Sequence, residues 1–374
     1  MKIAQVVKAL PSSFGGGIQT HAWSLAMELV NSGHQVTFIT SSRLDPGQLY
    51  SISSVRIPLF ISQKSRLLAW IGDIIFNVSA FFVVLTRSAR WDVIHTHGRS
   101  GLFNSFLPFF IRKKVVTSFH SLTSDEIRFL SDVQVLEKVI LNAFILPAEK
   151  RLVRKALHPI SVSKFLSSVL QKGKPRSTFS VIPNGIDLTS FGSPVSSSLN
   201  QRWLCVARLE AIKGLDLLIR ALPFFPGTTL TLAGDGPKKE VLKKLALEIG
   251  VAERVYFAGR ISSSQIASIY RSHGLFLFPT RYESQGIVVL EACRFGLPVI
   301  ASNIPAISEV ILNESNGLLF EMDNLHDLVG KINQFYEEPE SKTNKKILSF
   351  QSHLAVNYSL VTMTRKVLEC YRSI

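Results

Sequence analysis

The sequence predicts an α/β protein built from two doubly wound, Rossmann-like domains. Short apolar runs alternate with helical patterns along all 374 residues, which is typical of parallel sheets covered by helices. A stretch rich in Ser, Gly and Pro at residues 190–200 interrupts this alternation, which then restarts. We therefore expect an N-terminal domain of residues 1–190, joined by a closing helix at 358–374, and a C-terminal domain of residues 191–357.

In the N-terminal domain, the first expected strand covers residues 2–7. The triplet Gly15-Gly16-Gly17 follows it and opens a helix whose apolar residues recur at the three- and four-residue spacing of one buried face. Gly33 is placed to end that helix. The remaining strands of this domain are expected at residues 35–40, 92–96, 115–119, 159–162 and 179–182.

The C-terminal domain repeats the pattern. Its strands are expected at residues 202–207, 228–232, 254–257, 275–278, 298–301 and 317–320. Its helices are expected at residues 215–222, 237–248, 264–273 and 286–295.

Basic residues are concentrated in the first half of the chain. Residues 1–190 contain 22 Lys and Arg against 10 Asp and Glu, whereas residues 191–374 contain 20 against 17, for a net charge of +15. An anionic membrane surface, an acidic acceptor or nucleic acid would suit a basic face, and a generally basic proteome is the alternative. Because no recognisable nucleic-acid module accompanies the charge, nucleic acid is not expected as a partner.

Two features predict a cytoplasmic protein. Cys205, Cys293 and Cys370 are widely spaced, and two of them lie within apolar patterns, which favours reduced thiols over disulfides. The N-terminus runs directly into a strand and lacks the apolar core and cleavage site of a signal peptide.

One stretch has the length of a membrane span. Residues 67–85 are mostly apolar, but Asp73 and Asn77 interrupt them. An acidic residue near the middle of a span costs about 3 kcal/mol. Because the two polar residues lie four positions apart and share a helical face, we expect a helix with one polar stripe that packs in or on the domain. Docking on a membrane surface is a variant of this interpretation.

Two segments of the second half carry the residue types of a phosphosugar site. Residues 282–301 pass from a turn into a helix and place Glu283 and Glu291 eight positions apart. A helix start after a glycine-bearing turn aims free N–H groups at a bound phosphate, and carboxylates suit sugar hydroxyls. Arg208 and Lys213 follow another strand of the same sheet, at the edge where doubly wound sheets bind ligands.

Other chemistries find less support in the sequence. His95 and His97 end one expected strand and His120 ends the next, so all three are expected at the mouth of a cleft. No third metal ligand clusters with His95 and His97 in the sequence and there is no Asp-x-Asp pair, so no metal is expected. The first glycine loop lacks the spacing of a dinucleotide fingerprint, and the chain has no G-x-S-x-G elbow, which argues against nicotinamide enzymes and hydrolases.

Taken in order, these motifs resemble the retaining nucleotide-sugar glycosyltransferases of family 4, which have the GT-B fold, with two Rossmann-like domains facing across a cleft. The resemblance covers nearly the whole chain. Its motifs are the glycine loop, Asp92-Val-Ile-His-Thr-His97, Phe119-His120, Ile182-Pro-Asn-Gly-Ile-Asp187, Val206-Ala-Arg208 with Lys213-Gly214, Ala233-Gly-Asp-Gly-Pro237, and the segment from Glu283 and Glu291 to Gly296-Leu-Pro-Val299.

The resemblance implies roles for individual side chains. Arg208 and Lys213 would hold the donor diphosphate and stabilise charge on the leaving group, and Glu283 would bond hydroxyls of the donor sugar. Glu291 would hold the ribose hydroxyls, and His120 would line the reacting centre. Such enzymes retain the anomeric configuration, and the donor phosphate is the group generally discussed as accepting the acceptor's proton.

The resemblance also implies contacts from loops. Arg260 and Ile261 would lie near the nucleobase, and Gly16 and Gly17 close to the diphosphate when the domains shut. Backbone contacts to sugar and phosphate are expected from Ser284, Gln285, Gly286, Ile287 and Val288. The family commonly has an aromatic residue where Gln285 stands, so the identity of the donor sugar stays open.

The implied reaction transfers a hexose-type sugar from a UDP-, GDP-, ADP- or TDP-linked donor to a sugar or lipid-linked acceptor. It would serve the assembly of cell-surface polysaccharide, lipopolysaccharide or glycolipid, without a cofactor. The basic N-terminal domain would hold the acceptor. We therefore also expect that the protein can bind peripherally to the inner face of the cytoplasmic membrane. A GT-B sugar-nucleotide epimerase, transfer to a soluble small molecule, and a non-catalytic binding protein are the alternatives.

Overall fold

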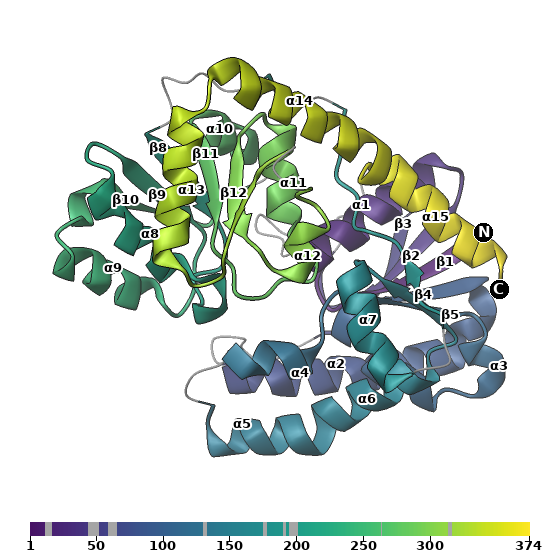
Figure 1. The fold of residues 1–374 in the computed structure, drawn as a ribbon. Coiled ribbons are helices and arrows are strands. Elements are labelled where there is room, and N and C mark those ends of the chain that lie inside the picture. Colours follow the sequence, from purple (N-terminus) through teal and green to yellow (C-terminus); the bar gives the residue numbers. More distant parts are fainter. Residues whose placement is uncertain are drawn as a thin grey trace. The chain divides into compact units, whose positions relative to one another are not determined.

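The protein consists of two compact units (Figure 1). A computed structural model describes residues 1–11, 17–43, 52–58, 66–129, 133–174, 178–189, 192–193, 201–262, 264–312 and 316–374. Unit 1 comprises Met1–Gly185 and Leu360–Ile374, and unit 2 comprises Ile186–Ser359. Each unit holds one parallel sheet, so the predicted two-domain α/β architecture is confirmed.

The sheet of unit 1 has the strand order β3-β2-β1-β4-β5-β6-β7. Its strands are β1 (Lys2–Val6), β2 (Gln35–Thr40), β3 (Ile52–Arg56), β4 (Val93–His97), β5 (Val115–Phe119), β6 (His158–Ser161) and β7 (Ser180–Val181). Six of them lie where the sequence predicts strands. Strand β3 was not predicted, because it is an edge strand with no buried residue and therefore lacks an apolar run.

Successive residues on these strands point to opposite faces of the sheet, and each face has its own helices. Ile3 belongs to a core formed with α1 (Gly17–Asn31) and α15 (Leu360–Arg372). Ala4 belongs to a core formed with α2 (Arg66–Arg87). The remaining helical segments of unit 1 are η1 (Ser88–Arg90), η2 (Gly98–Phe106), α3 (Phe109–Arg112), α4 (Thr123–Glu126), η3 (Ile127–Phe129), α5 (Val135–Ile140), η4 (Leu141–Ile145), α6 (Leu146–Lys155) and α7 (Lys164–Gly173).

Helix α2 contains the long apolar stretch of the sequence. Within the described part of the chain, α2 and the turn after it form the one segment whose length and hydropathy would allow it to cross a membrane, and 33% of its apolar window is buried. The polar stripe faces the protein: the Lys8 ammonium lies 2.6 Å from the Asp73 carboxylate, and the Leu102 N–H donates to the Asn77 side chain at 2.9 Å. One face of α2 thus packs against the rest of unit 1.

The sheet of unit 2 has the order β10-β9-β8-β11-β12-β13. Its strands are β8 (Arg202–Val206), β9 (Thr229–Ala233), β10 (Val255–Gly259), β11 (Leu275–Phe278), β12 (Val299–Ser302) and β13 (Leu318–Phe320). Its helical segments are η6 (Ala211–Lys213), α8 (Leu215–Ala221), η7 (Leu222–Phe224), α9 (Lys239–Glu248), η8 (Ala252–Arg254), α10 (Ile266–Arg271), α11 (Ile287–Arg294), α12 (Pro305–Ser308), α13 (Leu325–Glu337) and α14 (Glu340–Asn357). All six strands lie where the sequence predicts them.

Aromatic contacts fix the helices of unit 2 on its sheet. The indole N–H of Trp203, on β8, donates to the hydroxyl of Tyr336, on α13, at 2.8 Å. Tyr270, on α10, is fully buried, and its ring lies 5.7 Å from that of Phe276 and stacks at 5.3 Å on that of Phe295. The second set of contacts packs α10 against β11 and against the end of α11.

Candidate functional site

The candidate site of unit 2 lies where the sheet reverses its winding. Strand β8 lies between β9 and β11, so the chain leaves β8 in one direction and returns on its other side. Ligands of doubly wound sheets bind beyond the carboxyl ends of two such strands. The loops after β8 and β11 touch there: Gly214 has φ +64°, and a Cβ at this position would lie 2.1 Å from the Pro279 carbonyl oxygen. Glycine therefore allows the two loops to come together.

Lys213 and Glu283 form an ion pair between these loops. The Lys213 ammonium contacts Oε1 of Glu283, and the two side chains are only 17% and 22% exposed. The ammonium also lies 5.9 Å from the centre of the Phe278 ring. The structure thus brings together two residues that the sequence places 70 positions apart.

Arg208 follows the same strand but has a different environment. Its side chain is 76% exposed and pairs with the Glu210 carboxylate two residues later. Arg208 and Lys213 therefore lie in the same loop, each with its own carboxylate, and only Lys213 contacts Glu283.

Arg281 fastens the two loops and was not predicted from the sequence. Its guanidinium lies 2.7 Å from Asp323 and 3.2 Å from Asp216, and it also donates to the Ala211 carbonyl oxygen. The Arg281 N–H donates to the Ile212 carbonyl oxygen at 2.8 Å. Since a planar guanidinium can serve several acceptors at once, this residue holds η6, and Lys213 with it, against the loop after β11.

The turn into α11 offers polar groups to the same edge of the sheet. Gly286 is the N-cap of α11 and has φ +78°, where a Cβ would lie 2.5 Å from Cδ1 of Ile307. Ser284 and Gln285 are both buried, and the Ser284 hydroxyl has no hydrogen-bond partner in the described part of the chain. Ile287 and Val288 pack against the core of unit 2, and the first N–H groups of a helix have no partner within it. The turn thus places the Ser284 hydroxyl beside the start of α11, and the predicted backbone cradle stays a prediction.

Glu291 lies one turn further along α11 and is held by Tyr270. The Tyr270 hydroxyl donates to Oε2 of Glu291 at 3.0 Å. Burial raises the pKa of Glu291 to about 7, and the hydrogen bond from Tyr270 lowers that pKa in part. Burial and the neighbouring carboxylate raise the pKa of Tyr270 well above its ordinary value. The two predicted glutamates thus differ: Glu283 is ion-paired, and Glu291 is desolvated with a hydroxyl partner.

Arg260 and Ile261 follow β10, two strands away from β8. The Arg260 guanidinium lies 3.9 Å from Asp235, and Ile261 packs against the core of unit 2. The structure therefore keeps these two residues in the same unit as Lys213 and Glu283.

The remaining predicted residues belong to unit 1. His120 follows β5 and is 7% exposed; Gly17 begins α1, and Gly16 lies outside the described residues. The expectation that His95 lies at the mouth of a cleft is wrong. His95 is completely buried, and its ring nitrogens bond the hydroxyls of Tyr371 and Ser118, each at 2.7 Å. The side chain faces α15, which covers this face of the sheet.

Comparison with known proteins gives matches over both units. The family model described as Glycosyltransferase Family 4 matches residues 15–190, and the model described as Glycosyl transferases group 1 matches residues 197–347. An uncharacterized glycosyltransferase of Methanocaldococcus jannaschii is 28% identical over 85% of this chain and 84% of its own length. Alpha-monoglucosyldiacylglycerol synthase of Streptococcus pneumoniae is 25% identical over 84% of this chain and 74% of its own length. Sucrose-phosphate synthase of Thermosynechococcus elongatus has the same fold, with a TM-score of 0.82 and 20% identity over 100% of this chain and 98% of that structure.

Proposed function

This chain belongs to the family 4 glycosyltransferases with the GT-B fold, and we propose that it transfers a sugar from a nucleoside-diphosphate donor, bound by unit 2, with retention of anomeric configuration. It is an enzyme of the glycosyltransferase class. The finer proposal rests on one observation above the others: Lys213 and Glu283 meet at the winding reversal of a parallel sheet.

This ion pair suits the junction between a sugar and its diphosphate. An ammonium attracts a phosphate oxygen as a point charge, and a carboxylate accepts hydrogen bonds from sugar hydroxyls. Since charge builds up on the departing phosphate during transfer, a cation already fixed beside it lowers the barrier. Arg281 supports this arrangement because its guanidinium donates to the Ala211 carbonyl oxygen of η6 while Asp216 and Asp323 hold it in place.

The remaining donor contacts follow from the environments of α11 and its turn. The unpartnered Ser284 hydroxyl and the free N–H groups at the start of α11 would bond phosphate or sugar oxygens. We assign the ribose hydroxyls to Glu291, whose position the Tyr270 hydroxyl fixes. Arg208, Arg260, Ile261, Gly16, Gly17 and His120 keep the donor-side and catalytic roles expected from the family.

Nucleotide binding tests the proposal directly. We expect one of UDP, GDP, ADP and TDP to raise the melting temperature of the protein in the presence of EDTA, because the proposed site uses protein cations. Lys213→Ala should lose most of this stabilisation, whereas Lys244→Ala, which removes an exposed lysine of α9, should retain it. Indifference of the wild-type protein to all four nucleotides would contradict the assignment of the donor site.

Product analysis separates transfer from the alternatives. We expect sugar to leave the matching nucleotide sugar only when an acceptor is present, and the new anomeric linkage, read by NMR, to match that of the donor. Conversion of the donor sugar to its epimer without any acceptor would identify an epimerase instead. An inverted linkage would reject the proposed retention.

We further propose that the acceptor lies at an anionic membrane, which unit 1 approaches with an apolar and basic surface. Large apolar side chains stand exposed along neighbouring parts of this unit: Ile75, Val78, Phe82, Phe106, Phe109, Phe110, Val135, Leu136, Val139 and Phe144. Cations accompany them, since Lys113 lies 5.0 Å from the ring centre of Phe109 and Arg151 lies 4.4 Å from that of Phe106. Apolar side chains interspersed with cations are typical of interfacial binding to anionic lipid. The S. pneumoniae relative bears the name alpha-monoglucosyldiacylglycerol synthase, which agrees with a lipid acceptor for this chain.

Sedimentation with vesicles tests this surface. Vesicles containing phosphatidylglycerol should carry the protein down at low salt, less so at high salt, and vesicles of phosphatidylcholine alone should not. The double variant Phe109→Ser/Phe110→Ser should weaken binding, whereas Phe224→Ser, which changes an equally exposed phenylalanine of unit 2, should not. If no vesicle binds, the acceptor is the soluble small molecule of the alternative interpretation.

A further inference from the structure

Arg99 lies at the carboxyl edge of the sheet of unit 1. It belongs to η2 and follows His97, the last residue of β4, by two positions. The central carbon of its guanidinium lies 4.8 Å from the ring centre of Trp70, on α2. Trp70 is 7% exposed and packs in a small core with Leu102 and Ile140. A guanidinium stacked on a fixed indole ring is held in orientation while its N–H groups stay accessible.

A carboxylate from the next loop faces this guanidinium. Glu126 ends α4, which follows β5, and its Oε2 lies 3.5 Å from Nη1 of Arg99. The start of α4 is fixed by the buried Glu149, which accepts from the Thr123 N–H at 2.9 Å and from the Thr123 hydroxyl at 2.8 Å. Because β4 and β5 are neighbours in the sheet, the two side chains meet at the edge where doubly wound domains bind ligands.

The contact between Arg99 and Glu126 is long and open to solvent. The two side chains are 38% and 37% exposed, and Nε of Arg99 lies 3.7 Å from the Asp73 carboxylate. By contrast, the Lys8 ammonium lies only 2.6 Å from Asp73, and those side chains are 17% and 13% exposed. Charge-assisted bonds to a carboxylate are normally about 2.7–2.9 Å long. Arg99 and Glu126 therefore do not saturate each other, and both can bond a ligand.

The balance of charge favours a ligand with hydroxyl groups over an anion. Arg99 is faced by two carboxylates, those of Asp73 and Glu126. An anion would have to approach both of them to reach the guanidinium, and like charges repel. A hydroxyl both donates and accepts hydrogen bonds. One hydroxyl of a sugar can thus accept from Arg99 while the neighbouring hydroxyl donates to Glu126.

We propose that Arg99 and Glu126 bind two neighbouring hydroxyls of a sugar carried by the acceptor. The identification of this sugar as part of the acceptor rests on the proposed function, whereas its binding by unit 1 does not. Segment η2 also carries Phe106, one of the exposed side chains of the proposed membrane surface. A glycolipid therefore suits both features, because its chains would meet the apolar surface and its headgroup would meet Arg99.

Saturation-transfer NMR without any nucleotide tests this sugar subsite. The probes are the octyl glycosides of glucose, galactose, mannose and N-acetylglucosamine, each below its micelle concentration. Since an octyl chain can bind any apolar surface, saturation of the sugar-ring protons is the diagnostic signal, and we expect it for at least one glycoside.

Variants assign the ring signal to the two side chains. Arg99→Met should raise the dissociation constant of that glycoside by about tenfold or more, and Glu126→Gln should raise it by a smaller factor, because an amide oxygen still accepts. Arg365→Met should leave the dissociation constant unchanged, since it removes an exposed arginine of α15 that is paired with Glu369 at 3.1 Å. The stabilising nucleotide should still raise the melting temperature of all three variants, which shows that they are folded.

Three results would overturn the proposal. One is saturation confined to the octyl chain of every glycoside, and another is equal ring saturation in the wild-type protein and Arg99→Met. The third is stronger headgroup saturation of lysophosphatidylglycerol that Arg99→Met abolishes, because it would identify an anion site.

Turnover separates this proposal from the proposed function. With the matching nucleotide sugar, Arg99→Met should raise KM for the glycoside and leave KM for the donor unchanged. Ring saturation that depends on Arg99, without any transfer, would support the sugar subsite and contradict the proposed function alone.

Discussion

The bond between Tyr270 and Glu291 makes the pH dependence of donor binding predictable. Replacing Tyr270 by Phe removes only the hydroxyl that donates to Glu291 at 3.0 Å, and the ring keeps its stacking on Phe295. A hydrogen bond to a charged group contributes about 1.5–3 kcal/mol, which corresponds to about 1–2 pKa units. Because this bond lowers a pKa that burial raises to about 7, the variant should hold Glu291 protonated well above neutral pH.

A protonated Glu291 would accept fewer hydrogen bonds from the two ribose hydroxyls that we assign to it. Donor affinity, measured by calorimetry from pH 6 to 9, should therefore rise with pH through about 7 in the wild-type protein and through a value about 1–2 units higher in Tyr270→Phe. Affinities should converge at the alkaline end. Tyr336→Phe is the matched control, since it removes the hydroxyl of a partly buried tyrosine of unit 2, the one that accepts from Trp203. The same curve in all three proteins would refute the reasoning, and so would a loss of affinity in Tyr270→Phe that is independent of pH.

Three further predictions concern stability. Burial raises the pKa of Glu291 from 4.5 to about 7, so the contribution of Glu291 to the free energy of unfolding is fully present below pH 4.5 and is lost as pH rises to 7. The difference in melting temperature between Glu291→Gln and the wild-type protein should therefore favour the variant more at pH 8 than at pH 5. Burial lowers the pKa of His97, so the neutral ring contributes stability that is present above pH 6.5 and is lost on acidification. The urea midpoint of His97→Gln should therefore fall less between pH 7 and pH 5 than that of the wild-type protein. Gly214→Ala should lower the urea midpoint more than Gly250→Ala. Both glycines have a positive φ, but only a Cβ at position 214 would meet a backbone oxygen, that of Pro279. Equal losses in the two variants would show that the contact with Pro279 is relieved at no cost.

Much of the fold is predictable because both faces of each sheet are covered. Strands buried on two sides read as continuous apolar runs, and β8 and β11 are of this kind. The contact between Lys213 and Glu283 was also predictable, because both residues follow strands whose carboxyl ends lie at the same edge of the sheet. Edge strand β3 escaped prediction because its residues are partly or fully exposed and carry no such run.

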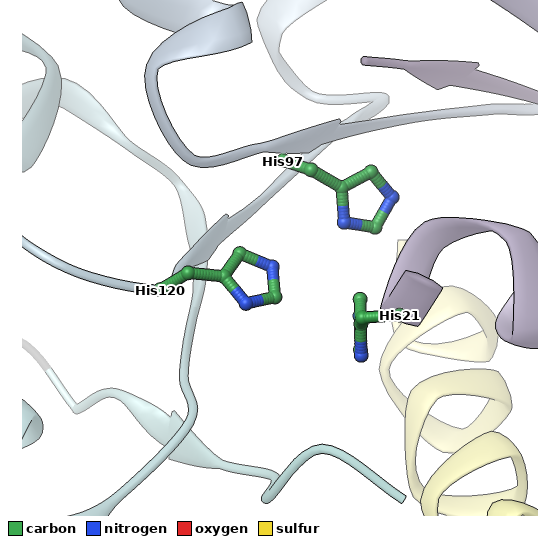
Figure 2. A group of neighbouring side chains, drawn as sticks. All are labelled: His21, His97 and His120. Atoms are coloured by element: carbon green, nitrogen blue, oxygen red, sulfur yellow. The ribbon is translucent and has the colours of Figure 1, made fainter. Parts of the chain in front are cut away.

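The buried histidines His21, His97 and His120, which each place a ring nitrogen within 4.8 Å of the others (Figure 2), show what the sequence could not supply. His97 and His120 were recognised at neighbouring strand ends, but the third member, His21, lies on a helix that returns over that face of the sheet. Its position in the apolar pattern of α1 is that of an ordinary core residue. Tyr270 was not predicted for a similar reason. In the sequence, a buried aromatic residue of a helix looks like any residue of the core, and only the structure shows that its hydroxyl bonds Glu291.

The two cations after β8 would meet the proposed donor diphosphate in different ways. Lys213 is mostly buried and held by Glu283, and its ammonium has three donors, so it can keep the carboxylate while it bonds a phosphate oxygen. Arg208 pairs with Glu210 on the surface, where such pairs contribute about 0–1 kcal/mol. We therefore expect an arriving phosphate, with its greater charge and its match to a planar guanidinium, to displace Glu210 at little cost. On the proposed donor site, Lys213 would define the position of the leaving phosphate before the donor arrives, and Arg208 would close on it afterwards.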